Sequence, residues 1–351
     1  MTYPEATDIK SIIDNGQHLV IIQADNPDAD SLGSSLALEH ILGDLGKQVS
    51  LYCGIDMPTY IRYLSGWDRV NKDLPKQFDA SIIVDASTYT LLEKLQNSGQ
   101  LSWVAARPSV ILDHHAIVEH RLDFAKVVIN DSGVSSTGEL VYCLAKQLGW
   151  AINQTAGEFI MTAILGDTQG LSNDLAKSQT YQVMAELVEF GVSRPQLEEL
   201  RREYSKMPTV IFKYKARLID RTELSADGRI AHVSVPQAEI NDYSPLYNPA
   251  PLIQNDMLQT VGVAVAIVFK QYNDGHVTGA IRTNPGFGIA NQLAEKMGGG
   301  GHPNASGFKV TDGRSLDELR SQCLELCDQL LDNFEKEQIH GEAIQHPDQA
   351  D

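Results

Sequence analysis

The chain has 351 residues, 42% of them hydrophobic, and its 28 Lys and Arg against 46 Asp and Glu give a formal net charge of −18. The hydrophobic content is sufficient for packed cores, which argues against a disordered chain, and the length predicts two domains. The acidic balance argues against binding of long duplex nucleic acid, because such binding needs many cationic contacts to phosphates.

The cysteine content and the first residues bear on the compartment. Cys53, Cys143, Cys323 and Cys327 are few and lie in apolar contexts, which fits a reducing environment without a disulfide framework. The opening MTYPEATDIK has neither the basic nor the apolar segment of a signal peptide, and no apolar run approaches the roughly 20 residues that span a bilayer. We therefore expect a cytoplasmic protein without membrane contact.

The first half of the chain alternates apolar strands with amphipathic helices. Strands are predicted over residues 18–23, 48–52, 80–84, 109–112 and, at an edge, 126–129, and helices over residues 7–15, 31–45, 135–148 and 158–165. This order predicts an α/β domain with a mostly parallel, doubly wound sheet. In such sheets, ligands bind beyond the carboxyl ends of the strands.

The second half begins with a helical, charged stretch over about residues 177–218, which is typical of a connector. Strands are then predicted over residues 229–235, 261–269, 277–282 and 307–310, and helices over residues 289–297 and 315–334. The pattern predicts a second, smaller α/β domain across a cleft. We place the first domain at 1–195, a helical connector at 196–215, the second domain at 216–335 and a disordered acidic tail at 336–351.

An acidic turn follows the first predicted strand, in the segment IIQADNPDADSLGS at residues 21–34. Asp28 and Asp30 lie two residues apart after Pro27, where the backbone leaves the strand, so both carboxylates can face one cation or a pair of them. The N-terminus of the next helix would suit a phosphate. For this stretch alone, an ordinary acidic turn with Ser31 as the helix cap is the alternative.

Further acidic and histidine side chains stand at strand and helix ends. Asp85 ends one strand, Asp113, His114 and His115 follow the next, and Asp167 ends a helix. Carboxylates and imidazoles suit two Mn²⁺ or Mg²⁺ ions, with Asp85 as the candidate bridging ligand. Adjacent histidines point in different directions, so one can bind metal while the other faces substrate and Asp113 orients a ring. Each residue alone could be a capping or loop residue, but together they predict a two-metal site.

A glycine run at residues 298–301 precedes His302. One glycine is predicted to end the preceding helix, and the backbone N–H groups of the run to cradle a phosphate or nucleotide, with Arg282 and His302 as partners. A flexible hinge is the alternative. Cys323 and Cys327 lie four residues apart on one helical face, which predicts core packing.

Five motifs in chain order resemble those of the DHH phosphoesterase superfamily and its DHH-associated C-terminal domain. They are Asn26-Pro27-Asp28-Ala29-Asp30-Ser31, Asp85, Asp113-His114-His115, Gly166-Asp167 and Gly299-Gly300-Gly301-His302-Pro303-Asn304-Ala305-Ser306-Gly307. The resemblance covers roughly residues 10–335 and is greatest to the bifunctional oligoribonuclease and phosphoadenosine phosphate phosphatase type. Exonucleases of the RecJ type are usually longer, and manganese-dependent inorganic pyrophosphatases end in a different domain.

The resemblance implies two divalent ions, Mn²⁺ or else Mg²⁺. It implies that Asp28 and Asp85 bind one ion and that Asp30, Asp85, His114 and Asp167 bind the other. The sequence departs from the family four residues before Asp28, where the usual histidine is replaced by Ala24. The first ion would then have fewer protein ligands unless Asp25 or another side chain substitutes, and the preference could shift toward Mg²⁺.

The function that the resemblance implies is hydrolysis of short single-stranded RNA and of 3′,5′-bisphosphorylated adenosine. A metal-activated water would attack phosphorus, and His115 would position the phosphate or protonate the leaving oxygen. The nucleotide end of the substrate would be held by Arg282, Gly299, Gly300, Gly301, His302 and Ser306. A cyclic dinucleotide phosphodiesterase and a non-catalytic nucleotide-binding module stay open as alternatives, and so does a homodimer.

Overall fold

The computed structural model describes residues 2–115, 121–244 and 246–345. It divides into two compact units, Met1–Lys206 and Met207–Asp351, and the division falls inside the connector predicted at 196–215. None of the helices in the described part of the chain is long and apolar enough to cross a membrane.

The first unit is built on a six-stranded parallel sheet of order β3-β2-β1-β4-β5-β6. Every residue of β4 and β5 is buried, as expected for parallel strands that are covered on both faces. The sheet confirms the predicted doubly wound α/β fold, with the last strand at an edge. The strands are β1 (His18–Ile22), β2 (Gln48–Tyr52), β3 (Val70–Asn71), β4 (Ala80–Val84), β5 (Ser109–Asp113) and β6 (Val127–Asn130).

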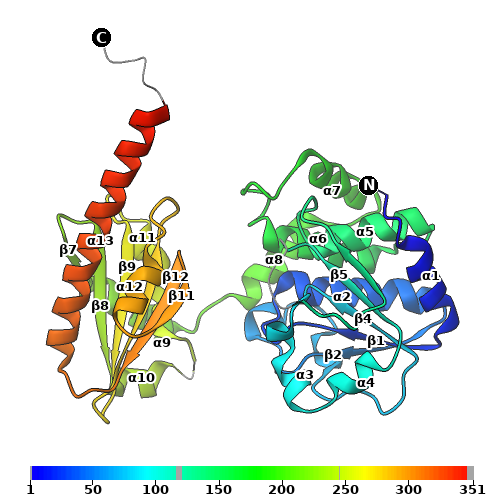
Figure 1. The fold of residues 1–351 in the computed structure, drawn as a ribbon, viewed down its shortest axis with the longest axis horizontal. Coiled ribbons are helices and arrows are strands. Elements are labelled where there is room, and N and C mark those ends of the chain that lie inside the picture. The colour runs from blue at the N-terminus through cyan, green and yellow to red at the C-terminus, as the bar shows by residue number, and fades with distance from the viewer. Residues whose placement is uncertain (1, 116–120, 245, 346–351) are drawn as a thin grey trace. The chain divides into compact units, whose positions relative to one another are not determined.

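Helices cover both faces of this sheet (Figure 1). One face packs against α1 (Ala6–Asn15), α2 (Ala29–Asp44), α5 (Thr137–Leu148), α6 (Gln154–Asp167) and α7 (Ser178–Glu189). The other face packs against the short helices α3 (Glu93–Asn97) and α4 (Leu101–Ala105). The unit ends with α8 (Arg194–Tyr204) and also contains the 3₁₀ segments Thr59–Ile61, Trp67–Arg69 and Tyr89–Leu92.

The strand order reverses at β1, which pairs with β2 on one side and with β4 on the other. The carboxyl ends of β1 and β4 therefore meet at the switch point where doubly wound sheets bind ligands. Asp28 and Asp30 follow β1, Asp85 follows β4, and His114 follows β5. The topology thus delivers the predicted ligands to one edge of one sheet.

The second unit has a mixed six-stranded sheet of order β11-β12-β10-β9-β8-β7. Its strands β8 and β9 are parallel and the other neighbouring pairs are antiparallel. The sheet confirms the second, smaller α/β domain. The strands are β7 (Glu223–Ser225), β8 (Ile230–Pro236), β9 (Val265–Gln271), β10 (Val277–Thr283), β11 (Gly300–His302) and β12 (Ala305–Val310).

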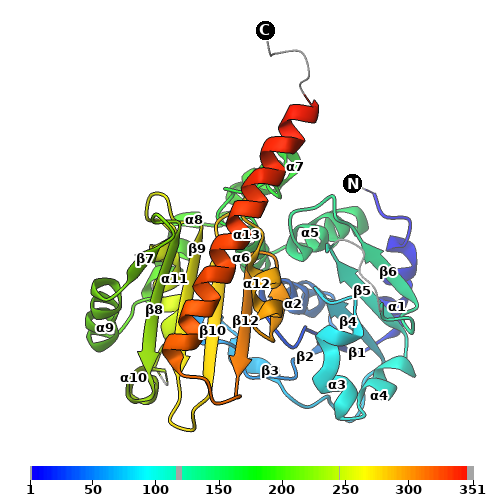
Figure 2. The ribbon, with the colours of Figure 1, turned by 60° about the vertical axis from the view of Figure 1, so that its left-hand side comes forward.

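Helices pack against both faces of this second sheet. Helices α12 (Ala290–Lys296) and α13 (Leu316–Gln345) cover the face seen in front in Figure 2, and α9 (Thr209–Asp220) and α11 (Pro249–Leu258) cover the other. A further helix, α10 (Gln237–Tyr243), follows β8. Cys323 and Cys327 lie on α13 and are fully buried in the core of this unit, as their spacing predicts, and burial raises the pKa of Cys323 to about 12.

The prediction of a disordered tail from residue 336 is wrong for the described part of that segment, because α13 continues to Gln345. Six of residues 336–345 are Lys, Glu, Gln or Ala, which are strong helix formers. Extending an existing helix fixes one residue for each hydrogen bond gained and avoids the cost of nucleation. Residues 346–351, also assigned to the tail, lie outside the described residues.

Candidate metal centre

Asp28 opens α2 as its N-cap. Its Oδ1 atom accepts hydrogen bonds from the backbone N–H groups of Asp30 and Ser31 at 2.9 and 3.0 Å. The cap is therefore Asp28 and not Ser31, which corrects the alternative considered for this turn. Because Asp28 satisfies two of the first N–H groups of α2, the helix N-terminus has fewer donors for a phosphate than its sequence predicts.

Asp30 is fully buried and is held by the start of α5. Its Oδ2 atom accepts the N–H of Thr137 at 2.7 Å, and its Oδ1 atom accepts the N–H of Gly138 at 2.9 Å and the hydroxyl of Ser34 at 3.0 Å. Burial raises the pKa of Asp30 and the nearby Asp167 raises it further, against the opposing effect of these hydrogen bonds. The sequence did not predict the supporting contacts, since Thr137 was assigned only to a helix start.

Asp85 lies directly after β4 with a φ of 56°, in the left-handed region. Its Oδ2 atom accepts the hydroxyl of Ser31 at 2.6 Å, and its Oδ1 atom accepts the hydroxyl of Thr137 at 3.3 Å. Burial first, and then the charges of Asp30 and Asp28, raise the pKa of Asp85 well above its ordinary value. Asp85 thus carries both backbone strain and an unfavourable charge environment.

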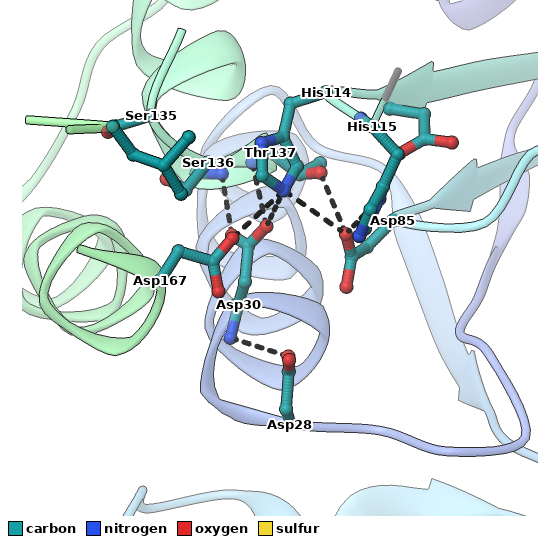
Figure 3. Close-up of polar contacts among 12 residues, drawn as sticks. Asp28, Asp30, Asp85, His114, His115, Ser135, Ser136, Thr137 and Asp167 are labelled. Atoms are coloured by element: carbon teal, nitrogen blue, oxygen red, sulfur yellow. Dashed lines mark hydrogen bonds and ion pairs between the residues drawn. The ribbon is translucent and has the colours of Figure 1, made fainter. Parts of the chain in front are cut away.

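His114 is buried among three carboxylates (Figure 3). Its Nε2 atom lies 2.9 Å from Asp167 Oδ2, 3.6 Å from Asp30 Oδ2 and 3.8 Å from Asp85 Oδ1. Burial alone would lower the pKa of His114, but Asp167 and Asp30 together raise it above its ordinary value. One imidazole nitrogen therefore faces all three acidic groups that the sequence assigned to metal binding with it.

The His115 ring lies beside the His114 ring, with 4.6 Å between the ring centroids, and its side chain is about half exposed. Asp113 Oδ1 lies 2.8 Å from its Nδ1 atom and also accepts its backbone N–H at 3.1 Å. This is the orienting contact predicted for Asp113. The same Nδ1 atom lies 3.4 Å from Asp85 Oδ1, and the hydrogen bond to Asp113, despite burial, raises the pKa of His115.

The donor atoms form two overlapping groups. Atoms of Asp30, His114 and Asp167 lie within 4.8 Å of one another, as do atoms of Asp85, His114 and His115. Carboxylate oxygens with imidazole nitrogens are a donor set suited to Mn²⁺ and similar ions. A divalent cation would also offset the repulsion among buried carboxylates. The residues present therefore fit a metal centre, while Asp28 belongs to neither group and lies on the far side of Asp30 from the histidines (Figure 3).

Ala24, where the family usually has a histidine, lies just after the carboxyl end of β1. Ala24 is 3% exposed and packs in the apolar cluster beneath α3 and α4. The neighbouring Asp25 accepts the backbone N–H of Lys94 at 2.7 Å through its Oδ2 atom. Within the described residues, neither donor group includes Asp25, so the structure does not place it as a substitute ligand.

The glycine run at residues 298–301 lies in the second unit, and it differs from the phosphate-binding cradle that the sequence predicts. Gly298 has a φ of 84° after α12, and the N–H groups of Gly298 and Gly299 donate to carbonyl groups in the last turn of that helix. This confirms the predicted glycine cap but removes two N–H groups from phosphate binding. The next residues form β11, where a Cβ on Gly301 would lie 2.6 Å from Ser306 Oγ, so close strand approach accounts for this glycine.

The other candidates of the second unit lie on neighbouring strands. Arg282 on β10 is exposed and stands opposite Ala305 on β12, which in turn stands opposite His302 on β11. The Ser306 hydroxyl donates to the His302 carbonyl at 2.7 Å. The pairing register thus brings Arg282, His302 and Ser306 to one end of the sheet.

Comparison with known proteins agrees with this architecture. Residues 18–165 match the model of the DHH family, N-terminal domain, and residues 250–329 match that of the DHHA1 domain. The chain is 23% identical over 305 residues to the bifunctional oligoribonuclease and PAP phosphatase NrnA of Bacillus subtilis, covering 86% of this chain and 92% of that protein.

Solved structures show the same fold. An exopolyphosphatase-related protein from Bacteroides fragilis superposes with a TM-score of 0.78 at 21% identity, covering 95% of this chain and all of that one. RecJ from Thermus thermophilus in complex with Mn²⁺ superposes with a TM-score of 0.51 at 14% identity, covering 92% of this chain and 54% of RecJ.

Proposed function

Because the chain belongs to the DHH phosphoesterases that carry a DHHA1 domain, we propose that it hydrolyses short RNA oligonucleotides and 3′,5′-bisphosphate nucleotides with the help of two divalent ions. The observation that carries the proposal is the convergence of Asp30, Asp85, His114 and Asp167, from four separate elements, on one edge of the sheet. A purely structural cluster of this kind would leave buried carboxylates facing one another without compensation.

The ion-binding role falls to the residues that the structure brings together. Asp30, Asp85, His114 and Asp167 would hold the ions, with Asp28 as a further ligand of one of them. When bound, the ions lower the pKa of water and neutralise charge on phosphoryl oxygens. Mn²⁺ suits the mixed nitrogen and oxygen donors, and Mg²⁺ is the alternative.

His115 would act on the substrate. Because its Nδ1 atom is held 2.8 Å from Asp113, its Nε2 atom is the one that can reach a phosphate or leaving oxygen. When protonated, the imidazole can donate a proton to that oxygen. In the second unit, Arg282, Gly300, Gly301, His302 and Ser306 would bind the nucleotide part of the substrate.

The choice of substrate is supported by the NrnA relative, whose name states oligoribonuclease and PAP phosphatase activities. The test is a hydrolysis panel of RNA of two to five nucleotides, 3′,5′-bisphosphorylated adenosine and a cyclic dinucleotide, each with Mn²⁺, Mg²⁺ or EDTA. We expect the first two to be hydrolysed only with metal, and the activity to vanish in Asp85→Asn. Faster turnover of the cyclic dinucleotide would replace the substrate assignment, and no turnover with either ion would refute the enzymatic role.

A further inference from the structure

A cavity of about 480 Å³ lies in the second unit, on the face of the sheet that α11 covers. The neighbouring strands β9, β10 and β12 line it, and they can be followed in Figure 2. Its volume is within the range of about 300–1,000 Å³ that is typical of small-molecule sites. Gly298 and Gly299 also line it, but Arg282, His302 and Ser306 do not. The cavity is therefore separate from the end of the sheet where those three residues lie.

Two lysines line this cavity, and among the described residues that line it none is acidic. Lys270 on β9 and Lys309 on β12 both stand opposite Thr278 on β10, so the three side chains share one face of the sheet. Because neighbouring strands are about 4.8 Å apart, the Cα atoms of the two lysines are about 10 Å apart. The long, flexible lysine side chains can therefore reach a common anion. Such a surface stands out in a chain of net charge −18.

The charge on these lysines is not neutralised. Lys270 is half-buried, its Nζ atom donates to the neutral Asn248 Oδ1 at 2.7 Å, and burial lowers its pKa. In the ranges that the structure describes, neither Lys270 nor Lys309 forms an ion pair. Asp274 interacts electrostatically with Lys309, but its carboxylate is bonded to His276. An anion in the cavity would offset the cost of burying the Lys270 ammonium group without a counterion.

Helix α11 begins beside the same cavity. Its N-cap Asn248 lines the cavity, and the Asn248 side chain accepts the N–H of Ala250 at 3.2 Å. The N-terminus of a helix carries a partial positive charge, which adds to the charge of the two lysines. The Thr278 hydroxyl supplies a neutral donor between them. Two ammonium groups, a helix N-terminus and a hydroxyl are donors that suit a phosphate group.

We propose that this cavity binds a phosphate group through Lys270, Lys309 and Thr278 at the start of α11. The proposal goes beyond the proposed function, because binding at this position needs neither a metal ion nor hydrolysis. Thr278 lies four residues before Arg282 on β10, which is roughly 13 Å along an extended strand. The phosphate group belongs either to a small phosphorylated molecule or to a strand of RNA that continues past Arg282, and the two sources share the same chemistry.

The test uses the full chain in EDTA, so that no anion binds through a divalent ion. Calorimetric titration with inorganic pyrophosphate should show binding that weakens about tenfold in Lys270→Gln and in Lys309→Gln, because each variant removes one charged donor. Circular dichroism checks that the variants are folded, and Lys309 is exposed, so its replacement leaves the core intact. No binding of millimolar pyrophosphate, or equal affinities in the parent and both variants, would overturn the site.

The matched control is Lys213→Gln, because Lys213 is an exposed lysine of the same unit that does not line the cavity. It should leave the affinity for pyrophosphate unchanged. An equal loss of affinity in Lys213→Gln would mean that pyrophosphate responds only to the overall charge of the unit, and this result would also overturn the site.

Titration with RNA distinguishes the two sources of the phosphate group. The probes are an RNA dinucleotide and an RNA pentanucleotide, again in EDTA, and of the two only the pentanucleotide is long enough to extend from Arg282 to Lys270. A loss of affinity for the pentanucleotide alone in Lys270→Gln would assign the cavity to the RNA strand. Unchanged affinity for both RNAs, with weaker pyrophosphate binding, would assign it to a small phosphorylated molecule. Because none of these measurements depends on turnover, an inactive parent protein would refute the proposed function and leave this site to be judged by binding.

Discussion

Asp85 concentrates the conflict between stability and function at a single residue. It combines a left-handed backbone, burial and three nearby negative charges, those of Asp30, Asp28 and Asp167. The left-handed conformation costs conformational free energy for non-glycine residues. The cost is smallest for Asp and Asn, because their short side chains form local hydrogen bonds with the backbone. Such a residue persists where the surrounding structure forces it, which is common at functional sites.

This conflict gives the first prediction. Without metal, the free energy of unfolding of Asp85→Asn should equal or exceed that of the parent protein. The variant removes a buried charge, and asparagine tolerates the φ of 56°. Asp85→Ala should be about 1 kcal/mol less stable than Asp85→Asn, because alanine is disfavoured at that φ. Urea denaturation in EDTA measures both.

The two variants should behave alike in catalysis, with a loss of Mn²⁺-dependent hydrolysis of at least about 100-fold. A stable Asp85→Asn protein that still turns over substrate would contradict the bridging role. If Asp85→Asn were instead clearly less stable in EDTA, the charge at this position would be stabilising, against the direction of its pKa shift.

The second prediction concerns Ala24→His, the change toward the usual residue of the family. Ala24 is 3% exposed in an apolar cluster, so the larger ring should lower stability by about 1–3 kcal/mol through overpacking. An added nitrogen ligand should keep or raise Mn²⁺-supported activity. A titration of activity with Mn²⁺, at a temperature where both proteins are folded, is the measurement. Loss of activity in the folded variant would show that this part of the site is determined by something other than a missing metal ligand at position 24.

At the residue scale, the sequence allowed prediction of Asp30, Asp85 and His114 at the metal centre, because they follow strands whose carboxyl ends share an edge, whereas Asp167 comes from the end of a helix. It did not allow prediction of Thr137 and Gly138, which hold Asp30 through backbone N–H groups. A backbone donor has no side-chain signature, and the two segments are more than 100 residues apart. Ser31 entered only as the helix cap in the alternative interpretation of the turn, whereas its hydroxyl donates to Asp85.

Among the elements, α2 and α6 approach each other closely at Gly33, which lies one turn after Asp30. A Cβ at this position would lie 2.8 Å from the Phe159 carbonyl oxygen. The third prediction is that Gly33→Ala lowers stability by about 1–3 kcal/mol in spite of the better helix propensity of alanine. Gly43→Ala in the same helix meets no atom within 4 Å and should raise stability by up to about 1 kcal/mol. Thermal denaturation separates the two, and stabilisation by both would mean that the helices can move apart.

The start of α5 depends on Glu139, which is buried. Glu139 Oε2 accepts the N–H and hydroxyl of Ser135, at 3.0 and 2.5 Å, and the hydroxyl of Thr180 at 2.9 Å. These bonds fix the loop that presents Thr137 to Asp30. Glu139 therefore acts on the metal centre only through other residues.

The fourth prediction follows from that arrangement. Glu139→Ala should lower stability by about 1–3 kcal/mol, because it leaves buried donors without an acceptor, and should weaken Mn²⁺ binding about tenfold. Glu139→Gln keeps an acceptor oxygen and should recover part of both losses. The exposed Glu189→Ala on α7 is the control and should change neither. Calorimetric Mn²⁺ titration of folded protein distinguishes a loss of positioning from simple unfolding, and unchanged affinity in Glu139→Ala would exclude the positioning role.

Sequence periodicity located most of the elements near the site, since β2 and β4 have the predicted bounds. It failed where tertiary pairing decides the structure. Gly300–His302 become a strand because β12 pairs with them, although glycine has no intrinsic preference for a strand. Helix α11 begins with the turn residues Pro249 and Pro251, which obscure its helical pattern, although proline is well tolerated in a first turn.

For the whole molecule, the two units have separate hydrophobic cores, each with its own sheet and helices. The candidate metal ligands all lie in the first unit. The tryptophans Trp67, Trp103 and Trp150 also all lie there, and they are the only three in the chain. Tryptophan fluorescence therefore reports unfolding of the metal-binding unit, while far-ultraviolet circular dichroism reports both units.

The last prediction uses this difference. Mn²⁺ at about 100 times its dissociation constant should stabilise the unit that binds it by about 2.7 kcal/mol, because the ion binds the folded and not the unfolded form. The fluorescence transition in urea should move to higher concentration, and the part of the dichroism transition that belongs to the second unit should stay where it is in EDTA. Asp85→Asn should reduce the shift, which controls for non-specific binding to this acidic chain. A shift of both transitions together would show that the units unfold as one, and no fluorescence shift at saturating Mn²⁺ would refute the metal centre itself.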